Sequence, residues 1–167
     1  NTGNSNTGVG YQSLATNSTA TNNTAVGTYS LYLNTTGGSN VANGYRALHS
    51  NTSGGNNSAF GTNALFTNTT GTSNVAVGRD ALHNNTTAGS NTAMGFQSML
   101  SNTTGTNNTA TGYHALKSNT TGTENTAKGS MSLFSSTTAG ECTALGFRAL
   151  YSLTTGNFNT TVGAHSS

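Results

Sequence analysis

A glycine recurs every 17 residues along the whole chain and anchors a repeated pattern. The best-preserved copy reads NTATGYHALKSNTTGTE and runs from Asn108 to Glu124. A short, fixed period without insertions is typical of solenoids, in which each repeat forms one coil that packs on its neighbours. The repeat therefore restricts the chain to a stacked array with ten registers. The ten glycines are Gly10, Gly27, Gly44, Gly61, Gly78, Gly95, Gly112, Gly129, Gly146 and Gly163.

The residues of the repeat favour β-structure. Gly, Asn and Thr are poor helix formers, and a chain with 5% charged residues and no proline lacks the composition of a disordered segment. We predict an all-β fold, a β-solenoid (parallel β-roll) of ten 17-residue coils with two short strands per coil. In the second coil, one strand lies within Asn23–Gly27 and the other contains Thr35-Thr36-Gly37.

Alternation before the glycine separates inward from outward positions. The residue two before the glycine is usually alanine and the residue four after it is leucine or methionine, so we expect both to point inward. The residue directly before the glycine and the mostly polar residue two after it should point outward. Leu82→Asn should then cost about 2–5 kcal/mol, whereas Asp80→Asn should cost almost nothing.

Asparagine fills two positions in most repeats, four before and seven after the glycine, such as Asn40 and Asn51. Asn tolerates left-handed backbone, and stacked Asn side chains can hydrogen-bond along an array. We interpret both rows as structural residues at two corners of the coil. Cys142 interrupts the first row, so we interpret the single cysteine as a substitution in a structural position.

Charge and titratable residues argue against several functions. A net charge of +2 provides no strong field for nucleic acid or anionic lipid, and no apolar run could span a membrane. His49 and His83 lie two coils apart, about 10 Å, too far to share a metal ion. Glu124 and Glu141 are stacked in neighbouring coils, which we interpret as chance proximity on a solvated turn. We expect no catalytic site, no metal, no cofactor, no nucleic-acid partner and no membrane insertion.

The consensus N-T-A-x-G-[YF]-x-A-L-x-x-N-T-T-G, nearly intact from Asn108 to Gly122, resembles the short repeats of bacterial and phage tail-fibre domain-containing proteins. Its NTAxG core is similar to the NSxAxG coils in the heads of trimeric autotransporter adhesins, which are left-handed parallel β-rolls joined as trimers. The resemblance covers all 167 residues. It implies a non-catalytic, structural and adhesive segment of a phage tail fibre or bacterial surface adhesin, located outside the cell or on the virion. We expect residues 1–167 to form a single repeat array that is a fragment of a longer fibre.

Apolar and aromatic rows are the candidate binding surface. We expect the residues directly before the glycine to pack against other copies of the chain in a parallel homotrimer. The aromatic residues five after the glycine should contact partner chains or a cell-surface glycan or receptor. The candidate contact residues are Val26, Phe60, Val77, Met94, Tyr32, Phe66, Phe134 and Tyr151.

Two alternative functions remain open. One is a self-assembling extracellular filament subunit that stacks end to end through uncapped coils. The other is an ice-binding β-solenoid, although adjacent threonines on a strand point to opposite faces and cannot form two ranks on one plane. The candidate ice-binding residues are Thr36, Thr70, Thr87, Thr104, Thr121 and Thr138.

Overall fold

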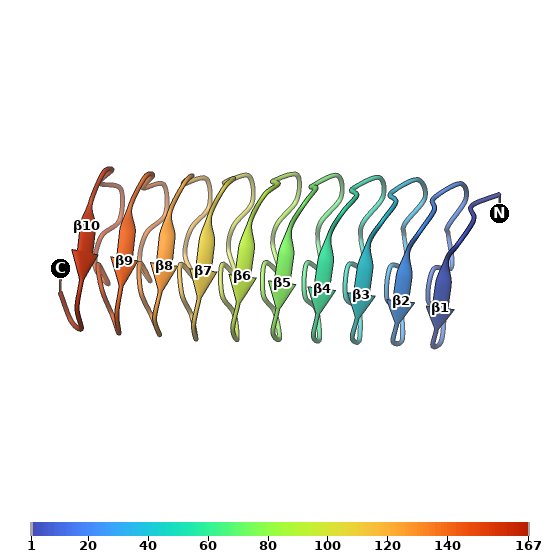
Figure 1. Cartoon of the computed structure of the whole chain (residues 1–167), viewed down its shortest axis with the longest axis horizontal. Coiled ribbons are helices and arrows are strands. Elements are labelled where there is room, and N and C mark those ends of the chain that lie inside the picture. The colour runs from blue at the N-terminus through green and yellow to red at the C-terminus, as the bar shows by residue number, and fades with distance from the viewer. Residues whose placement is uncertain (1, 167) are drawn as a thin grey trace.

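The computed structural model describes residues 2–166 as a regular stack of coils, with one three-residue strand in each (Figure 1). The strands form one parallel sheet in sequence order, and every paired residue lies 17 positions from its partner, as Thr92 does from Thr109. The predicted parallel β-solenoid is therefore confirmed. The strands are β1 (Thr7–Val9), β2 (Thr24–Val26), β3 (Val41–Asn43), β4 (Ser58–Phe60), β5 (Val75–Val77), β6 (Thr92–Met94), β7 (Thr109–Thr111), β8 (Thr126–Lys128), β9 (Thr143–Leu145) and β10 (Thr160–Val162).

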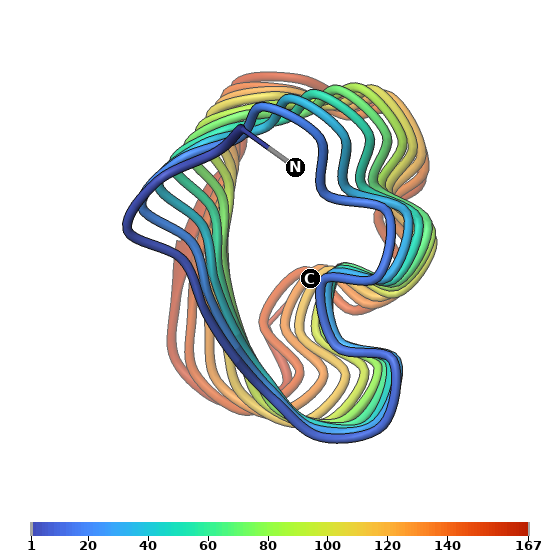
Figure 2. The same cartoon turned by 90° about the vertical axis from the view of Figure 1, so that its right-hand side faces the viewer.

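The number of strands per coil requires a correction, because the predicted second strand is a series of turns. After β2, Tyr29 and Leu31 have left-handed φ angles of 59° and 47°, which bend the chain repeatedly. Farther on, the carbonyl oxygen of Thr52 accepts hydrogen bonds from the backbone N–H groups of Thr35 and Thr36 at 2.9 and 3.1 Å. Two successive N–H groups therefore share one carbonyl acceptor, as in a turn and not as in a strand ladder. Figure 2 shows the stack end-on, with the strands on the long straight side and the folded turns opposite. The turn residues that follow the glycine of each coil, such as 28–33 in the second coil, are called the turn wall below.

The repeated glycines are required by both backbone conformation and close packing. Their φ angles lie between 127° and 145°, a region that L side chains rarely adopt. A Cβ added at Gly78 would lie 2.6 Å from the carbonyl oxygen of Gly95 in the next coil. The close neighbour at this position is the backbone of the adjacent coil.

One half of the interior is apolar. The alanine and leucine rows are fully buried through the middle of the stack, with Ala76 and Leu82 both 0% exposed. These inward assignments are confirmed. The leucine row also has left-handed backbone, with φ between 47° and 54°, which was not predicted. This conformation costs about 1–2 kcal/mol per residue, so the burial of each side chain has to offset it.

The other half of the interior is a double ladder of asparagines. Asn40 and Asn51, from opposite walls of the coil, both donate through Nδ2 to the carbonyl oxygen of Gly54, at 2.9 and 2.8 Å. Asn51 Nδ2 also donates to Oδ1 of Asn34 in the preceding coil at 2.7 Å. Such ladders satisfy polar groups that would otherwise be costly to bury, and the structural interpretation of both rows is confirmed.

The backbone expectation for these asparagines needs a correction. Neither row has positive φ; the left-handed residue is instead the one just before the first row, such as Ser39 with φ 58°. Asparagine is therefore required for its side-chain amide, which donates and accepts along the stack. Cys142 fits the same backbone, because its N–H still donates to Asn125 Oδ1 at 3.1 Å while its thiol lies 3.2 Å from the carbonyl oxygen of Gly156.

Ser136→Asn is expected to raise the free energy of unfolding by about 1 kcal/mol, because it repairs the second ladder. Asn119 Oδ1 and Ser136 Oγ are both buried without a hydrogen-bond partner. An asparagine at position 136 can donate to Asn119 Oδ1 and to the Ala139 carbonyl, as Asn85 does to Asn68 and Ala88 at 2.9 and 3.0 Å.

Chemical denaturation of Ser136→Asn measures this gain. Ser135→Asn is the matched control, because Asn84 occupies the equivalent position in another coil with its side chain exposed. The control should change stability by less than about 0.5 kcal/mol. A Ser136→Asn variant no more stable than the control would contradict the ladder as the source of stability.

Candidate binding surfaces

The outer face of the sheet carries two rows of side chains, three residues and one residue before each glycine. The first row is threonine or serine in eight strands and valine in two, and the second row is apolar in seven of the ten strands. Within the second row, Val26 and Val77 are half-buried, while Phe60 and Met94 are 41% and 44% exposed. Lys128 is the one charged residue in the two rows over all ten strands. This surface, called the strand face below, places four of the eight candidate contact residues together.

The other four candidates lie on the turn wall, as half-buried parts of ring stacks. Tyr32, His49, Phe66 and His83 form one continuous stack along the axis, with centroids 5.3, 5.0 and 5.1 Å apart. Phe134 and Tyr151 stack in the same way at 5.1 Å. The eight candidates therefore form two separate surfaces. The stack also explains why His49 and His83 cannot share a metal ion, since Phe66 lies between them.

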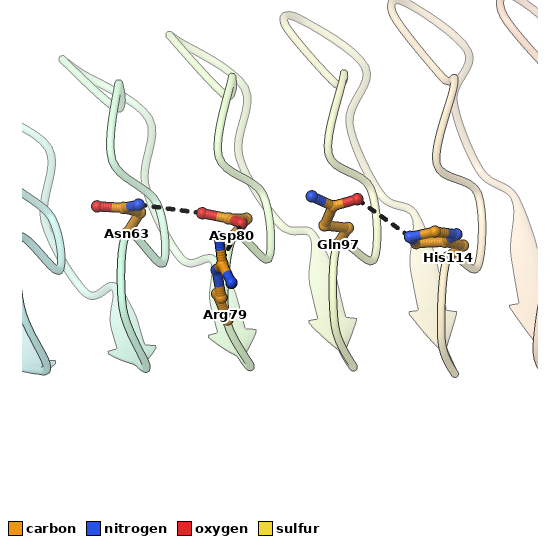
Figure 3. Close-up of polar contacts among 5 residues, drawn as sticks. All are labelled: Asn63, Arg79, Asp80, Gln97 and His114. Carbon is orange, nitrogen blue, oxygen red and sulfur yellow. Dashed lines mark hydrogen bonds and ion pairs between the residues drawn. The ribbon is translucent and has the colours of Figure 1, made fainter.

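The polar row two residues after the glycine requires a correction, because it lies largely against the turn wall. Asp80 is only 7% exposed; it accepts a hydrogen bond from Asn63 Nδ2 at 3.1 Å and pairs with Arg79 Nε at 3.2 Å (Figure 3). In the same row, His114 Nε2 and Gln97 Oε1 are 3.0 Å apart. Left-handed φ angles in this row, 57° at Asp80, turn the side chains toward the neighbouring coils. The polar groups of this row find hydrogen-bond partners within the stack, so Asp80→Asn is now expected to change the free energy of unfolding.

Arg46 and Arg148 lie against aromatic rings of the turn wall and were not among the predicted contact residues. The Arg46 guanidinium carbon is 5.0 Å from the ring centre of Tyr45, and that of Arg148 is 5.2 Å from the ring centre of Phe147. Such cation–π contacts favour arginine over lysine. The aromatic–arginine pairs at these positions were the sequence signal that could have identified them.

Two half-buried histidines of the turn wall, His49 and His114, have lowered pKa values. Burial, and to a lesser extent the positive charge of Arg46, lowers the pKa of His49 below its usual 6.5. Burial, and then the charge of Lys117, lowers the pKa of His114. Both imidazoles are therefore neutral at pH 7, and protonating either one opposes the fold.

Acidification from pH 7.5 to pH 5 is expected to lower the melting temperature. Because both folded pKa values lie below the unfolded value of about 6.5, the unfolded chain binds protons first as the pH falls. The stabilising contribution of these two histidines is fully present above about pH 6.5 and is lost as the pH falls through their lower pKa values in the folded state. Thermal melts at stepped pH measure the effect. The double variant His49→Phe/His114→Gln uses residues found in the same rows and should flatten the profile; an unchanged slope would contradict the assignment.

The candidate ice-binding threonines, Thr36 and its equivalents, are exposed and form a single ridge, one per coil. The preceding threonine of each pair is engaged with the next coil, as when Thr69 Oγ1 donates to the Thr86 carbonyl at 3.1 Å. Ser53 interrupts the ridge. The structure therefore gives one rank of threonines on this ridge rather than a two-rank plane.

Residues 2–166 contain no detectable pocket and no group of three or more His, Cys, Asp or Glu side chains that could hold a metal ion. Glu124 and Glu141 are both exposed on the turns that precede β8 and β9. The same part of the chain has no helix with the length and apolar character needed to cross a membrane.

Comparison of the chain with protein-family models, with curated proteins and with solved structures gives no match. Its function is therefore inferred from the strand face and the turn wall themselves.

Proposed function

We propose that this chain is a non-catalytic structural and adhesive segment of an extracellular fibre, of the phage tail-fibre or bacterial surface-adhesin kind, and that it assembles as a parallel homotrimer. The observation that carries the proposal is the strand face. It is a continuous surface of ten paired strands, with exposed apolar side chains at Phe60 and Met94 and a single charge at Lys128.

The strand face has the chemistry of a protein–protein interface. Large exposed apolar side chains aligned on a rigid surface lose contact with water when a partner covers them, at about 25 cal/mol per Å². A second copy in the same register presents the same ridge spacing of about 4.8 Å, so coils align with coils. Lys128 is exposed, and its long stem allows the ammonium group to reach water beside Thr111 and Leu145.

The interior supports a role as a rigid spacer. Backbone bonds join each coil to the next on the strand side and around the turns, as at Gly78 N–H to Phe60 O and Leu82 N–H to Ser98 O, at 2.8 and 3.1 Å. The asparagine ladders add side-chain bonds along the same axis. Such a stack transmits force through many parallel bonds, which suits a fibre.

Native mass spectrometry and sedimentation of the whole chain test the proposal. We expect a particle of about 50 kDa, three times the 16.8 kDa chain. Val77→Lys/Met94→Lys should give monomers, because six charges would be brought together in each trimer. Thr87→Lys, on the exposed threonine ridge, is the matched control and should leave the trimer intact. A soluble 16.8 kDa particle over a wide concentration range would contradict the trimer, and particles that grow with concentration would indicate an end-to-end filament.

A further inference from the structure

Arg46 presents an unused guanidinium on the turn wall. Within residues 2–166 its guanidinium makes no hydrogen bond or ion pair, and the Nε of that group is buried without a partner. One ring contact is with Tyr45, described above, and the other is with Tyr29, whose ring centre lies 5.9 Å from the guanidinium carbon. The terminal nitrogens therefore retain their hydrogen-bonding capacity on a side chain held in place by two rings.

The surroundings of Arg46 are aromatic and contain no carboxylate. Tyr29 packs edge-on against Tyr32 at 5.5 Å, and Tyr32 stacks on His49 at 5.3 Å. The only acidic residues in the chain are Asp80, Glu124 and Glu141, and Asp80 is paired with Arg79 two coils away. No acidic side chain among residues 2–166 pairs with Arg46, so the cluster is complementary to an anion that also has a ring to stack.

We infer that Arg46, with Tyr29, Tyr32, Tyr45 and His49, binds an acidic pyranose of the hexuronic acid class within a polysaccharide. The sugar carboxylate would accept two parallel hydrogen bonds from the guanidinium, a geometry that arginine provides and lysine does not. The apolar face of the sugar ring would lie on Tyr45, which is 44% exposed. The inference rests on the adhesive part of the proposed function and names its ligand class.

A similar arrangement occurs at Arg148, whose guanidinium carbon is also 5.2 Å from the ring centre of Tyr151 in its own coil and whose Nε is again buried without a partner. Arg46 and Arg148 are six coils apart, about 29 Å at the spacing of parallel strands. Each site is shallow, so a single sugar should bind weakly, and a long polysaccharide that reaches both sites would gain affinity by bivalency.

Arg79 provides an internal control. It also lies over a ring, with its guanidinium carbon 5.7 Å from the centre of Phe96, but Asp80 already occupies its Nε at 3.2 Å. Arg79→Gln and Arg46→Gln remove the same positive charge from neighbouring parts of the turn wall. Only the second should remove the binding group.

The experiment is an NMR titration of the whole chain with methyl β-glucuronide and with methyl β-glucoside, which differ by a carboxylate in place of a hydroxymethyl group. We expect the glucuronide to bind at least about tenfold more tightly. Arg46→Gln/Arg148→Gln should abolish this preference, Arg46→Lys/Arg148→Lys should lose most of it, and Arg79→Gln should keep it. Melting temperatures of all variants show whether each one is folded.

Equal affinities for the two glycosides, or an unchanged preference in the double glutamine variant, would overturn the inference. Inorganic phosphate binding as tightly as the glucuronide would also overturn it, because the site would then recognise charge without the sugar ring. The residues of both sites lie in turns and include none of the strand-face residues, so these results are read separately from the native mass measurement. A trimer without glucuronide preference would refute the site alone, whereas a monomer would refute the proposed assembly.

Discussion

Gly78→Ala is expected to lower the free energy of unfolding by about 4 kcal/mol or to prevent folding. The φ angle of Gly78 is 129°, where an L side chain is strained, and the new Cβ would lie 2.6 Å from the carbonyl oxygen of Gly95. The strain alone costs about 1–3 kcal/mol, and the clash is with backbone, which can be relieved only by moving two coils apart. The sheet between β5 and β6 would then lose register at the centre of the stack.

Denaturant unfolding of Gly78→Ala against Gly140→Ala tests this. A Cβ at Gly140 would lie 3.2 Å from the Thr123 carbonyl oxygen, a tight contact that a small shift relieves, and threonine already occupies the equivalent position at Thr106 and Thr123. Gly140→Ala should therefore change stability by less than about 0.5 kcal/mol. Comparable losses in the two variants would show that the glycine row is not special and that any added methyl group weakens the stack.

The period and the inward rows could be predicted because they depend on features that the sequence displays directly. A glycine at every 17th position fixes the coil length, and alanine and leucine mark the apolar half of the interior by size and hydrophobicity. The asparagine ladders could be predicted for the same reason, since an amide that repeats in every coil can bond to its own copy.

The turns that follow each strand and the position of Asp80 could not be predicted, because both depend on left-handed backbone that the sequence does not signal. Leucine is not a residue that marks positive φ, yet Leu82 has φ 51°. A polar row suggests exposure, but Asp80 finds partners in Asn63 and Arg79 and is buried. The turn wall, and the arrangement of Arg46 on two tyrosine rings, could therefore be recognised only in the structure.

Leu82→Asn is expected to lower the free energy of unfolding by about 2–5 kcal/mol. Leu82 is fully buried between the coils of Leu65 and Met99, so the substitution removes apolar contacts and leaves an amide without partners in the apolar half of the interior. The left-handed backbone acts in the opposite direction, because asparagine tolerates φ 51° better than leucine does, by about 1 kcal/mol. Burial is the larger effect, so the net change is a loss.

Leu33→Asn is the matched control, because Leu33 is 37% exposed and Asn84 occupies its position in another coil; the change should stay within about 0.5 kcal/mol. Leu82→Ala and Leu82→Gly separate the two opposing effects on Leu82. Both remove the buried side chain, but only glycine relieves the strained φ, so Leu82→Gly should be the more stable of the two by roughly 1 kcal/mol. In an ordinary strand or helix the order would be reversed. A glycine variant less stable than the alanine variant would therefore contradict left-handed backbone at the leucine row, even if both variants unfold more easily than the parent chain.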